Sequence, residues 1–136
     1  IKHEPGTPNI AGILGLGVAC EWINYIGYEE IQKQLLRVQT NLKDRGLFNI
    51  SGMDLIHPSD ELRNVFSFTT KVHAGDISAF LGNDNVAVRV GKVCAHPMVG
   101  KYGQGNILRV STHLYNDDAD CEKLVDKLCQ TIQKLS

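Results

Sequence analysis

The chain opens with an apolar run that predicts a helix. Thr7 and Pro8 are typical of the N-cap and the first residue of a helix. The run extends to about Ile26, and Gly27 is expected to end it. Glycines interrupt the run, and each lowers helix propensity by about 1 kcal/mol relative to alanine. They favour a helix that packs closely against another element through a stripe of Leu14, Val18, Trp22 and Tyr25.

A second helix is predicted over Tyr28–Arg45, where apolar residues repeat every three or four positions. Glu29 and Glu30 in its first turn and Lys43 in its last turn suit the helix dipole. Gly46 is the expected left-handed residue after the helix.

From Leu47 onward the pattern changes to short apolar runs between turns. Strands are predicted at 47–53, 64–72, 86–90 and 106–111, a polar loop at 54–63, a short helix at 73–81, and a last helix from about Asp117 to Leu135. Strands mixed with helices in this order predict an α+β fold, a small mostly antiparallel sheet covered by helices.

Composition narrows the possible classes of protein. A chain of 136 residues with 43% apolar content suits one domain with a modest core. A net charge of −1 argues against a nucleic-acid partner. No apolar run approaches the roughly 20 residues that cross a membrane, and no secretory signal is evident. The four cysteines lack the spacing of a zinc site, and free thiols favour a cytoplasmic location.

One cysteine stands in a loop rich in cations. Cys94 follows the predicted strand 86–90, with Arg89 and Lys92 before it and His96 after it. Nearby positive charge favours the thiolate, which is the nucleophilic form of cysteine. The sequence therefore predicts a reactive cysteine at position 94; the alternative is a structural cysteine at a strand end.

An arginine occupies the strand at 106–111. Alternation places Arg109 on the same face as Ile107 and Ser111. The guanidinium fork is best shaped to bind a carboxylate through two parallel hydrogen bonds. Arg109 is thus a candidate ligand for a substrate carboxylate; the alternative is a salt bridge to one of the chain's own acids, such as Asp117 or Asp118.

Gly6 and Thr7 precede the first predicted helix. Free N–H groups, a hydroxyl and the positive end of the helix dipole make this position a candidate anion site. The alternative is an ordinary helix cap.

These motifs together resemble a known family. Arg-x-Gly-x-x-Cys-Ala-x-Pro at 89–97, Arg-x-Ser-x-x-x-Tyr-Asn at 109–116, and the Gly-Thr-Pro segment at 6–8 resemble the C-terminal part of the group II cysteine desulfurases. These are class V aminotransferase-like, fold type I enzymes that use pyridoxal 5′-phosphate (PLP), and selenocysteine lyases are close kin. The resemblance runs from about Glu4 to Leu128. The pair before the cysteine is Lys92-Val93 here, where the family has His-His.

The resemblance implies a role for each candidate residue. Cys94 would take sulfur from L-cysteine as a persulfide, leaving L-alanine, and pass it to a sulfur-acceptor protein. Arg109 would bind the substrate carboxylate and Arg89 would orient or stabilise the cysteine loop. Gly6 and Thr7 would bind the PLP phosphate across a homodimer.

The resemblance also implies a longer parent enzyme. Family members are several-fold longer, and an upstream large domain supplies the lysine that binds PLP. We expect residues 1–46 to form linking helices, residues 47–136 to form the small C-terminal domain, and the chain alone to be inactive and to bind no PLP. The alternatives are a relative with other chemistry (selenocysteine lyase, transaminase or epimerase) and a stand-alone binding domain.

Overall fold

The computed structural model describes residues 3, 6–57, 63–92, 94–102 and 106–136. The chain divides into two compact units, unit 1 at residues 1–33 and unit 2 at residues 34–136, and helix α2 runs through the boundary. The expected domains, 1–46 and 47–136, concern the parent enzyme and stay predictions. Glu4, Pro5 and Val93 of the motifs, and residues 58–62 of the predicted polar loop, lie outside the described residues.

Unit 1 contains α1 (Ile10–Ile26) and the start of α2 (Tyr28–Asp44). The predicted N-cap at Thr7 is wrong, because the Oδ1 atom of Asn9 accepts the hydrogen bond from the Gly12 N–H at 3.0 Å. A Cβ atom at Gly12 would lie 2.6 Å from the Asn9 side chain, so any other residue at position 12 would force that side chain to shift. Gly27 ends α1 as predicted, with a φ of 85°.

Helix α1 is apolar on all sides. None of its residues is buried in the structure described, and Leu14, Val18 and Trp22 are 67%, 65% and 51% exposed. Gly15 and Gly17 likewise have open space where a Cβ atom would stand. Close packing of this helix therefore stays a prediction. Among the described residues no single helix is long and apolar enough to span a membrane, whereas α1 and α2 taken together, as a bent pair, pass that test by length and composition only.

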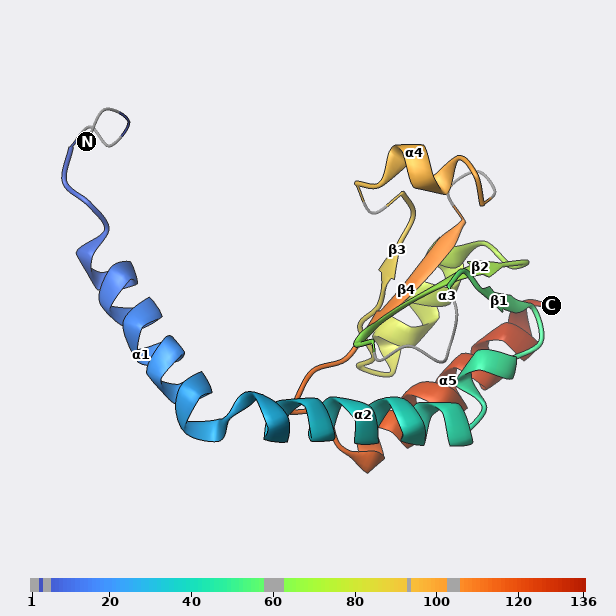
Figure 1. Ribbon diagram of the computed structural model, residues 1–136. Helices are drawn as coiled ribbons and strands as arrows, with labels where there is room; N and C mark the ends of the chain where they lie inside the picture. The colour runs from blue at the N-terminus through green and yellow to red at the C-terminus, as the bar shows by residue number, and fades with distance from the viewer. Residues whose placement is uncertain (1–2, 4–5, 58–62, 93, 103–105) are drawn as a thin grey trace. The chain divides into compact units, whose positions relative to one another are not determined.

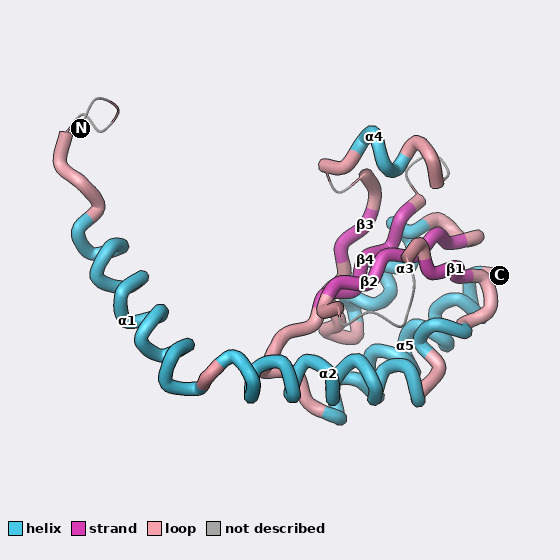
Figure 2. The backbone as a smooth tube through the Cα atoms, viewed as in Figure 1, coloured by secondary structure: helices cyan, strands magenta, loops and turns pink. Residues whose placement is uncertain are grey.

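Unit 2 is an antiparallel sheet with helices, in chain order η1, β1, β2, α3, β3, α4, β4 and α5 (Figures 1 and 2). Their bounds are η1 Leu47–Asn49, β1 Met53–Leu55, β2 Val65–Thr70, α3 Ala74–Asn83, β3 Arg89–Val90, α4 His96–Val99, β4 Ile107–Ser111 and α5 Asp118–Leu135. The strand order is β1-β2-β4-β3, with every ladder antiparallel. The α+β prediction is confirmed.

Two local predictions were wrong, and one element was missed. The strand expected at 47–53 begins only at Met53 and continues as β1 to Leu55, into the predicted polar loop. Before it, Gly46 turns the chain with a φ of 85°, and the 3₁₀ turn η1 buries Leu47 completely. The strand expected at 86–90 is only the two residues of β3. The single turn of α4 was not predicted, because four residues are too few to show a helical period.

The sheet has a core face and an open face. Phe66 and Phe68 of β2 and Leu108 and Val110 of β4 point into the core, under apolar residues of α2, α3 and α5. The residues between them point to the opposite side, so Ser67, Ile107, Arg109 and Ser111 lie on the open face. Figure 1 shows α4 on that side, and Val99 of α4 lines the same pocket as Ile107 of β4.

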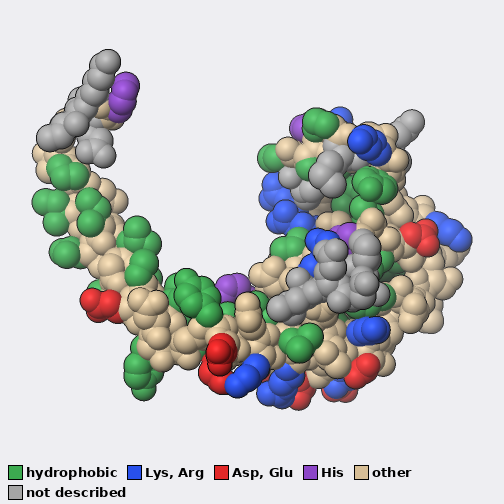
Figure 3. Space-filling view, in the orientation of Figure 1, with side chains coloured by type: hydrophobic (Ala, Val, Ile, Leu, Met, Phe, Trp, Pro, Cys, Tyr) green, Lys and Arg blue, Asp and Glu red, His purple; other side chains and the backbone are tan. Residues whose placement is uncertain are grey.

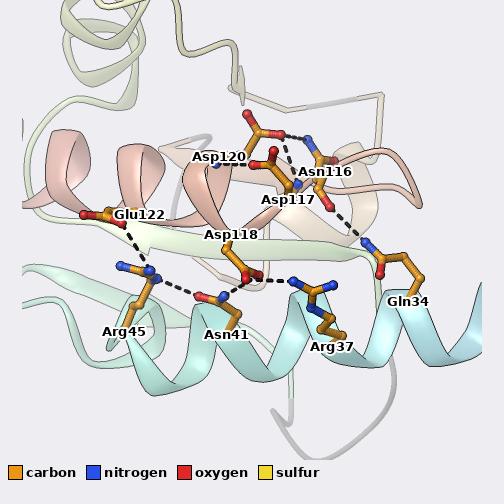
Figure 4. A network of polar contacts seen from close by, with 9 residues as sticks. All are labelled: Gln34, Arg37, Asn41, Arg45, Asn116, Asp117, Asp118, Asp120 and Glu122. Atoms are coloured by element: carbon orange, nitrogen blue, oxygen red, sulfur yellow. Dashed lines mark hydrogen bonds and ion pairs between the residues drawn. The ribbon is translucent and has the colours of Figure 1, made fainter.

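A polar network joins α2 to the start of α5 (Figure 4). Asp118 accepts hydrogen bonds from Arg37 at 2.7 Å and from Asn41 at 2.8 Å, and the Arg37 guanidinium holds the pKa of that carboxyl below its ordinary value. Asp117 caps α5 by accepting from the Asp120 N–H at 2.9 Å, and Asp120 accepts in return from the Asp117 N–H. The network fixes the chain just after β4.

Candidate functional site

Cys94 sits at the tip of a short turn on the open face. The turn is closed by the Ala95 N–H, which donates to the Lys92 carbonyl at 2.8 Å. Helix α4 follows at once, and its residue Val99 is only 6% exposed. Because α4 is anchored through Val99 while Cys94 is exposed, the turn presents the thiol outward from a fixed base.

The backbone of Cys94 is left-handed, with a φ of 60°. For a residue other than glycine this conformation costs roughly 1–2 kcal/mol, since Cβ approaches the following carbonyl. The described residues contain one other such case, Asn85, and asparagine tolerates the region well. Backbone strain of this kind concentrates at functional sites.

Two arginines face each other across the β3–β4 ladder. Arg89 pairs with Arg109 in register, so the two side chains emerge on the same side of the sheet. Neither forms an ion pair with a residue that the structure describes. Like charges directly opposite each other repel, so this pair favours an anion from outside the described part of the chain.

The Nε atom of Arg109 is buried and has no hydrogen-bond partner in the part of the chain described. The structural alternative is a salt bridge to one of the chain's own acids, with Asp117 and Asp118 as examples. Asp118 is instead bound by Arg37, and Asp117 caps α5. Among the described residues Arg109 therefore has no acidic partner, and its Nε donor is unused.

A pocket of about 210 Å³ lies between α4 and the open face of the sheet. Its lining is mostly apolar and includes Ile107 and Val99. Two other lining residues are joined by a hydrogen bond, in which the Ser67 N–H donates to Nε2 of His57 at 3.3 Å. The other lining residues are Ile56, Arg63, Ala95 and Tyr102. Sequence reasoning missed His57, Arg63 and Tyr102, which lie outside regular elements and share no motif.

Gly6 and Thr7 belong to unit 1, whereas Cys94, Arg89 and Arg109 belong to unit 2. Gly6 has a φ of 100°, and Thr7 is exposed three residues before α1. The Thr7 hydroxyl donates no hydrogen bond to any described residue, so it can still donate one to a phosphate. Asn9 already satisfies the Gly12 N–H, which removes one donor from the helix end.

The remaining cysteines differ from Cys94 in their surroundings. Cys121 is buried and Cys129 half-buried on α5, and burial raises the pKa of both thiols. Cys20 is exposed on α1 and is followed by Glu21. Only position 94 combines an exposed thiol with neighbouring cations among the described cysteines.

Comparison with known proteins places the chain in a family. Residues 1–124 match the family model for class-V aminotransferases. A probable cysteine desulfurase of Xylella fastidiosa strain Temecula1 is 35% identical over 135 residues, which are 98% of this chain and 32% of that protein. A cysteine desulfurase of Escherichia coli O127:H6 is 34% identical over 137 residues, again 98% of this chain and 32% of the relative.

Solved structures agree with this result. The cysteine desulfurase CsdA from Escherichia coli matches with a TM-score of 0.85 and 28% identity, over 99% of this chain and 33% of that one. A cysteine desulfurase from Thermococcus onnurineus matches with a TM-score of 0.85 and 27% identity, over 97% of this chain and 33% of that one. The chain spans about a third of the length of the relatives it matches. With its fold, its motifs and its family model in agreement, the chain belongs to the class-V aminotransferase family and is similar to the cysteine desulfurases within it.

Proposed function

We propose that this chain is the C-terminal part of a PLP-dependent cysteine desulfurase. The observation that carries the proposal is Arg109, whose buried Nε lacks a partner and whose guanidinium stands opposite a second arginine on the cysteine side of the sheet. A free amino-acid substrate always presents a carboxylate, and the arginine fork binds that group through two charge-assisted hydrogen bonds.

In this proposal Arg109 binds the carboxylate of L-cysteine, and Arg89 adds positive charge beside it. The Cys94 thiolate attacks the sulfur of the substrate. An S–S bond forms between the two sulfurs as the substrate C–S bond breaks, and the electron pair of that bond stays with the substrate carbon. Protonation of the carbon gives L-alanine, and the enzyme keeps a persulfide on Cys94.

In this proposal the chain binds the phosphate group of PLP. The Thr7 hydroxyl and the backbone of Gly6 fit one phosphate contact, since Gly6 is left-handed and Thr7 has no partner among the described residues. When bound, PLP withdraws electrons from the substrate and so makes the C–S bond breakable. The proposal includes a homodimer, an upstream domain that supplies the rest of the cofactor site, and no activity for this chain alone.

The test uses the parent enzyme, meaning this chain joined to its upstream domain. We expect L-cysteine to yield L-alanine, and Cys94→Ala to abolish alanine formation and the persulfide while PLP absorbance is kept. Cys20→Ala is the matched control, since it removes another exposed thiol. Alanine formation that survives Cys94→Ala would assign the chain to a relative whose chemistry does not need this thiol.

A further inference from the structure

One row of residues crosses the open face of the sheet and changes from apolar to cationic. Ser67 of β2 pairs with Arg109 of β4, which in turn pairs with Arg89 of β3. On the other side of Ser67, the Ile56 N–H donates to the Ser67 carbonyl at 2.9 Å, so Ile56 continues the row. Because cross-strand partners lie about 4.5–5.5 Å apart, an apolar group over Ile56 and Ser67 lies close to Arg109.

The pocket of about 210 Å³ includes the apolar end of this row. Its aliphatic lining residues come from the sheet, from the cysteine turn and from α4: Ile56, Ile107, Ala95 and Val99. Ile107 lies two residues before Arg109 on the same face of β4. Ala95 directly follows Cys94 in the chain. The pocket therefore borders both the arginine and the turn that carries the thiol.

The charge around the pocket is positive. The described residues that line it include Arg63 and no acid. Asp54 lies on the same face of the sheet, but it belongs to the edge strand β1 and is not part of the lining. Figure 3 shows blue side chains gathered around α4 and β3, with red further along the sheet. This distribution of charge favours an anionic ligand.

L-cysteine is too small to account for the pocket. Its side chain is one methylene group and one sulfur atom, whereas an apolar cavity of about 150 Å³ already holds a benzene molecule. A pocket of about 210 Å³ therefore has room for one aromatic ring on a short arm. Burial of such a ring against the aliphatic lining would add binding free energy to that of a carboxylate on the arginine.

We propose that this site binds carboxylic acids that carry one apolar ring, with the carboxylate on Arg109 and the ring in the pocket between α4 and the sheet. The inference rests on the proposed function for the carboxylate role of Arg109, and it adds a second point of contact that L-cysteine does not use. Such an acid has no sulfur for Cys94 to attack, so it occupies the site without reacting.

The test uses this chain and hydrocinnamate, in which a short arm joins a phenyl ring to a carboxylate. Titrations followed by amide-resolved NMR give both the affinity and the residues whose signals shift. We expect shifts at Ser67, Val99 and Ile107, and an affinity roughly tenfold above that of propionate, which lacks the ring. Hydrocinnamamide keeps the ring without the charge, and we expect it to bind roughly tenfold more weakly than hydrocinnamate.

Two substitutions separate the ring site from the carboxylate site. Ser67→Phe fills the pocket and is expected to remove the advantage of hydrocinnamate over propionate. Val65→Phe is the matched control, since it adds a ring to the same face of β2 outside the lining, and it should keep that advantage. Arg109→Met should weaken both acids and leave the binding of the amide unchanged. Circular dichroism establishes that each variant is folded.

Three results would overturn the proposal: equal affinities of the wild-type chain for hydrocinnamate and propionate, shifts confined to α1, or an advantage that survives Ser67→Phe. Binding needs no desulfuration, so a parent enzyme that forms no alanine would leave this result unaffected. Conversely, normal alanine formation by the parent, together with no binding of hydrocinnamate to the chain, would refute this inference alone.

Discussion

Arg89 and Arg109 lie directly opposite each other in the β3–β4 ladder, and neither has an acidic partner in the described part of the chain. Opposite like charges lower the stability of a sheet, by an amount on the order of 0.2–1 kcal/mol. The fold thus keeps two cations together at some cost to its own stability. A bound carboxylate would offset that cost, which links the arrangement to ligand binding rather than to folding.

Removing the charge of Arg109 should not destabilise the fold. Arg109→Met keeps much of the side-chain volume and relieves the repulsion, so we expect the free energy of unfolding to stay constant or to rise by up to about 1 kcal/mol. Urea denaturation of the chain measures this. Arg37→Met is the control and should lower stability, because Asp118 loses its ion-pair partner. A clear loss of stability in Arg109→Met would point to a structural role.

Substrate affinity should depend on the fork of Arg109 as well as on its charge. In the parent enzyme we expect Arg109→Lys to raise KM by roughly 30- to 150-fold, corresponding to about 2–3 kcal/mol for charged hydrogen bonds. Arg109→Ala should raise it further, with the PLP spectrum before substrate unchanged. Steady-state kinetics with L-cysteine test this, and an unchanged KM would refute the carboxylate role.

Cys94 should be alkylated before the other thiols near neutral pH. Burial raises the pKa of Cys121 and Cys129, so both react slowly there, and Cys20 has Glu21 rather than cations beside it. Limiting iodoacetamide followed by peptide mapping gives the order. The lag of Cys121 and Cys129 should shrink as pH rises toward their raised pKa values. Early labelling of either would contradict the argument from charge and exposure.

The left-handed backbone at position 94 should be measurable as strain. Cys94→Gly removes the clash of Cβ, and we expect a gain of up to about 1 kcal/mol in unfolding free energy. Cys94→Val should be less stable than Cys94→Ala, since a β-branched residue suits a positive φ least. Thermal melts of the three variants provide the comparison; equal stability of all three would show that the position is not strained.

Stability should fall in acid partly through Asp118. Arg37 lowers the pKa of this carboxyl in the folded state. The Asp118 carboxylate therefore contributes to folding stability above the pKa of an unfolded aspartate, about 3.9, and this contribution is lost as pH falls below that pKa. Asp118→Asn should therefore be less stable than wild type at pH 7 and should approach it near pH 3. Asp126→Asn, at an exposed site on the same helix, is the control. A gap that stays constant with pH would rule out the linkage.

The parts of the fold that the sequence predicts are those with a repeated pattern. Periodicity indicates α2 and α5, and alternation places Phe66 and Phe68 in the core and Arg109 opposite them. The cap of α1 was misassigned because threonine and asparagine are both good caps, and the choice depends on which side chain reaches the Gly12 N–H. In this chain Asn9 does.

The candidate site could be predicted only in part from the sequence. Cys94 and Arg109 stand in motifs, but their neighbours depend on register and tertiary packing. Arg89 lies opposite Arg109 because of the β3–β4 register. Strand β3 has only two residues, and so short a strand has no hydrophobic pattern from which the register could be predicted. His57 enters the pocket because β1 and β2 pair, and nothing in its own surroundings marks it.

The strand order β1-β2-β4-β3 has a consequence for the folding pathway. The β1–β2 and β3–β4 ladders each join neighbouring segments, whereas β2 and β4 meet only after α3, β3 and α4 have been enclosed between them. Closing that long loop costs conformational entropy before the β2–β4 hydrogen bonds can form. Pairing of β2 with β4 is therefore expected late in folding. The open face beneath Cys94 would then form late in folding, when β2 and β4 pair.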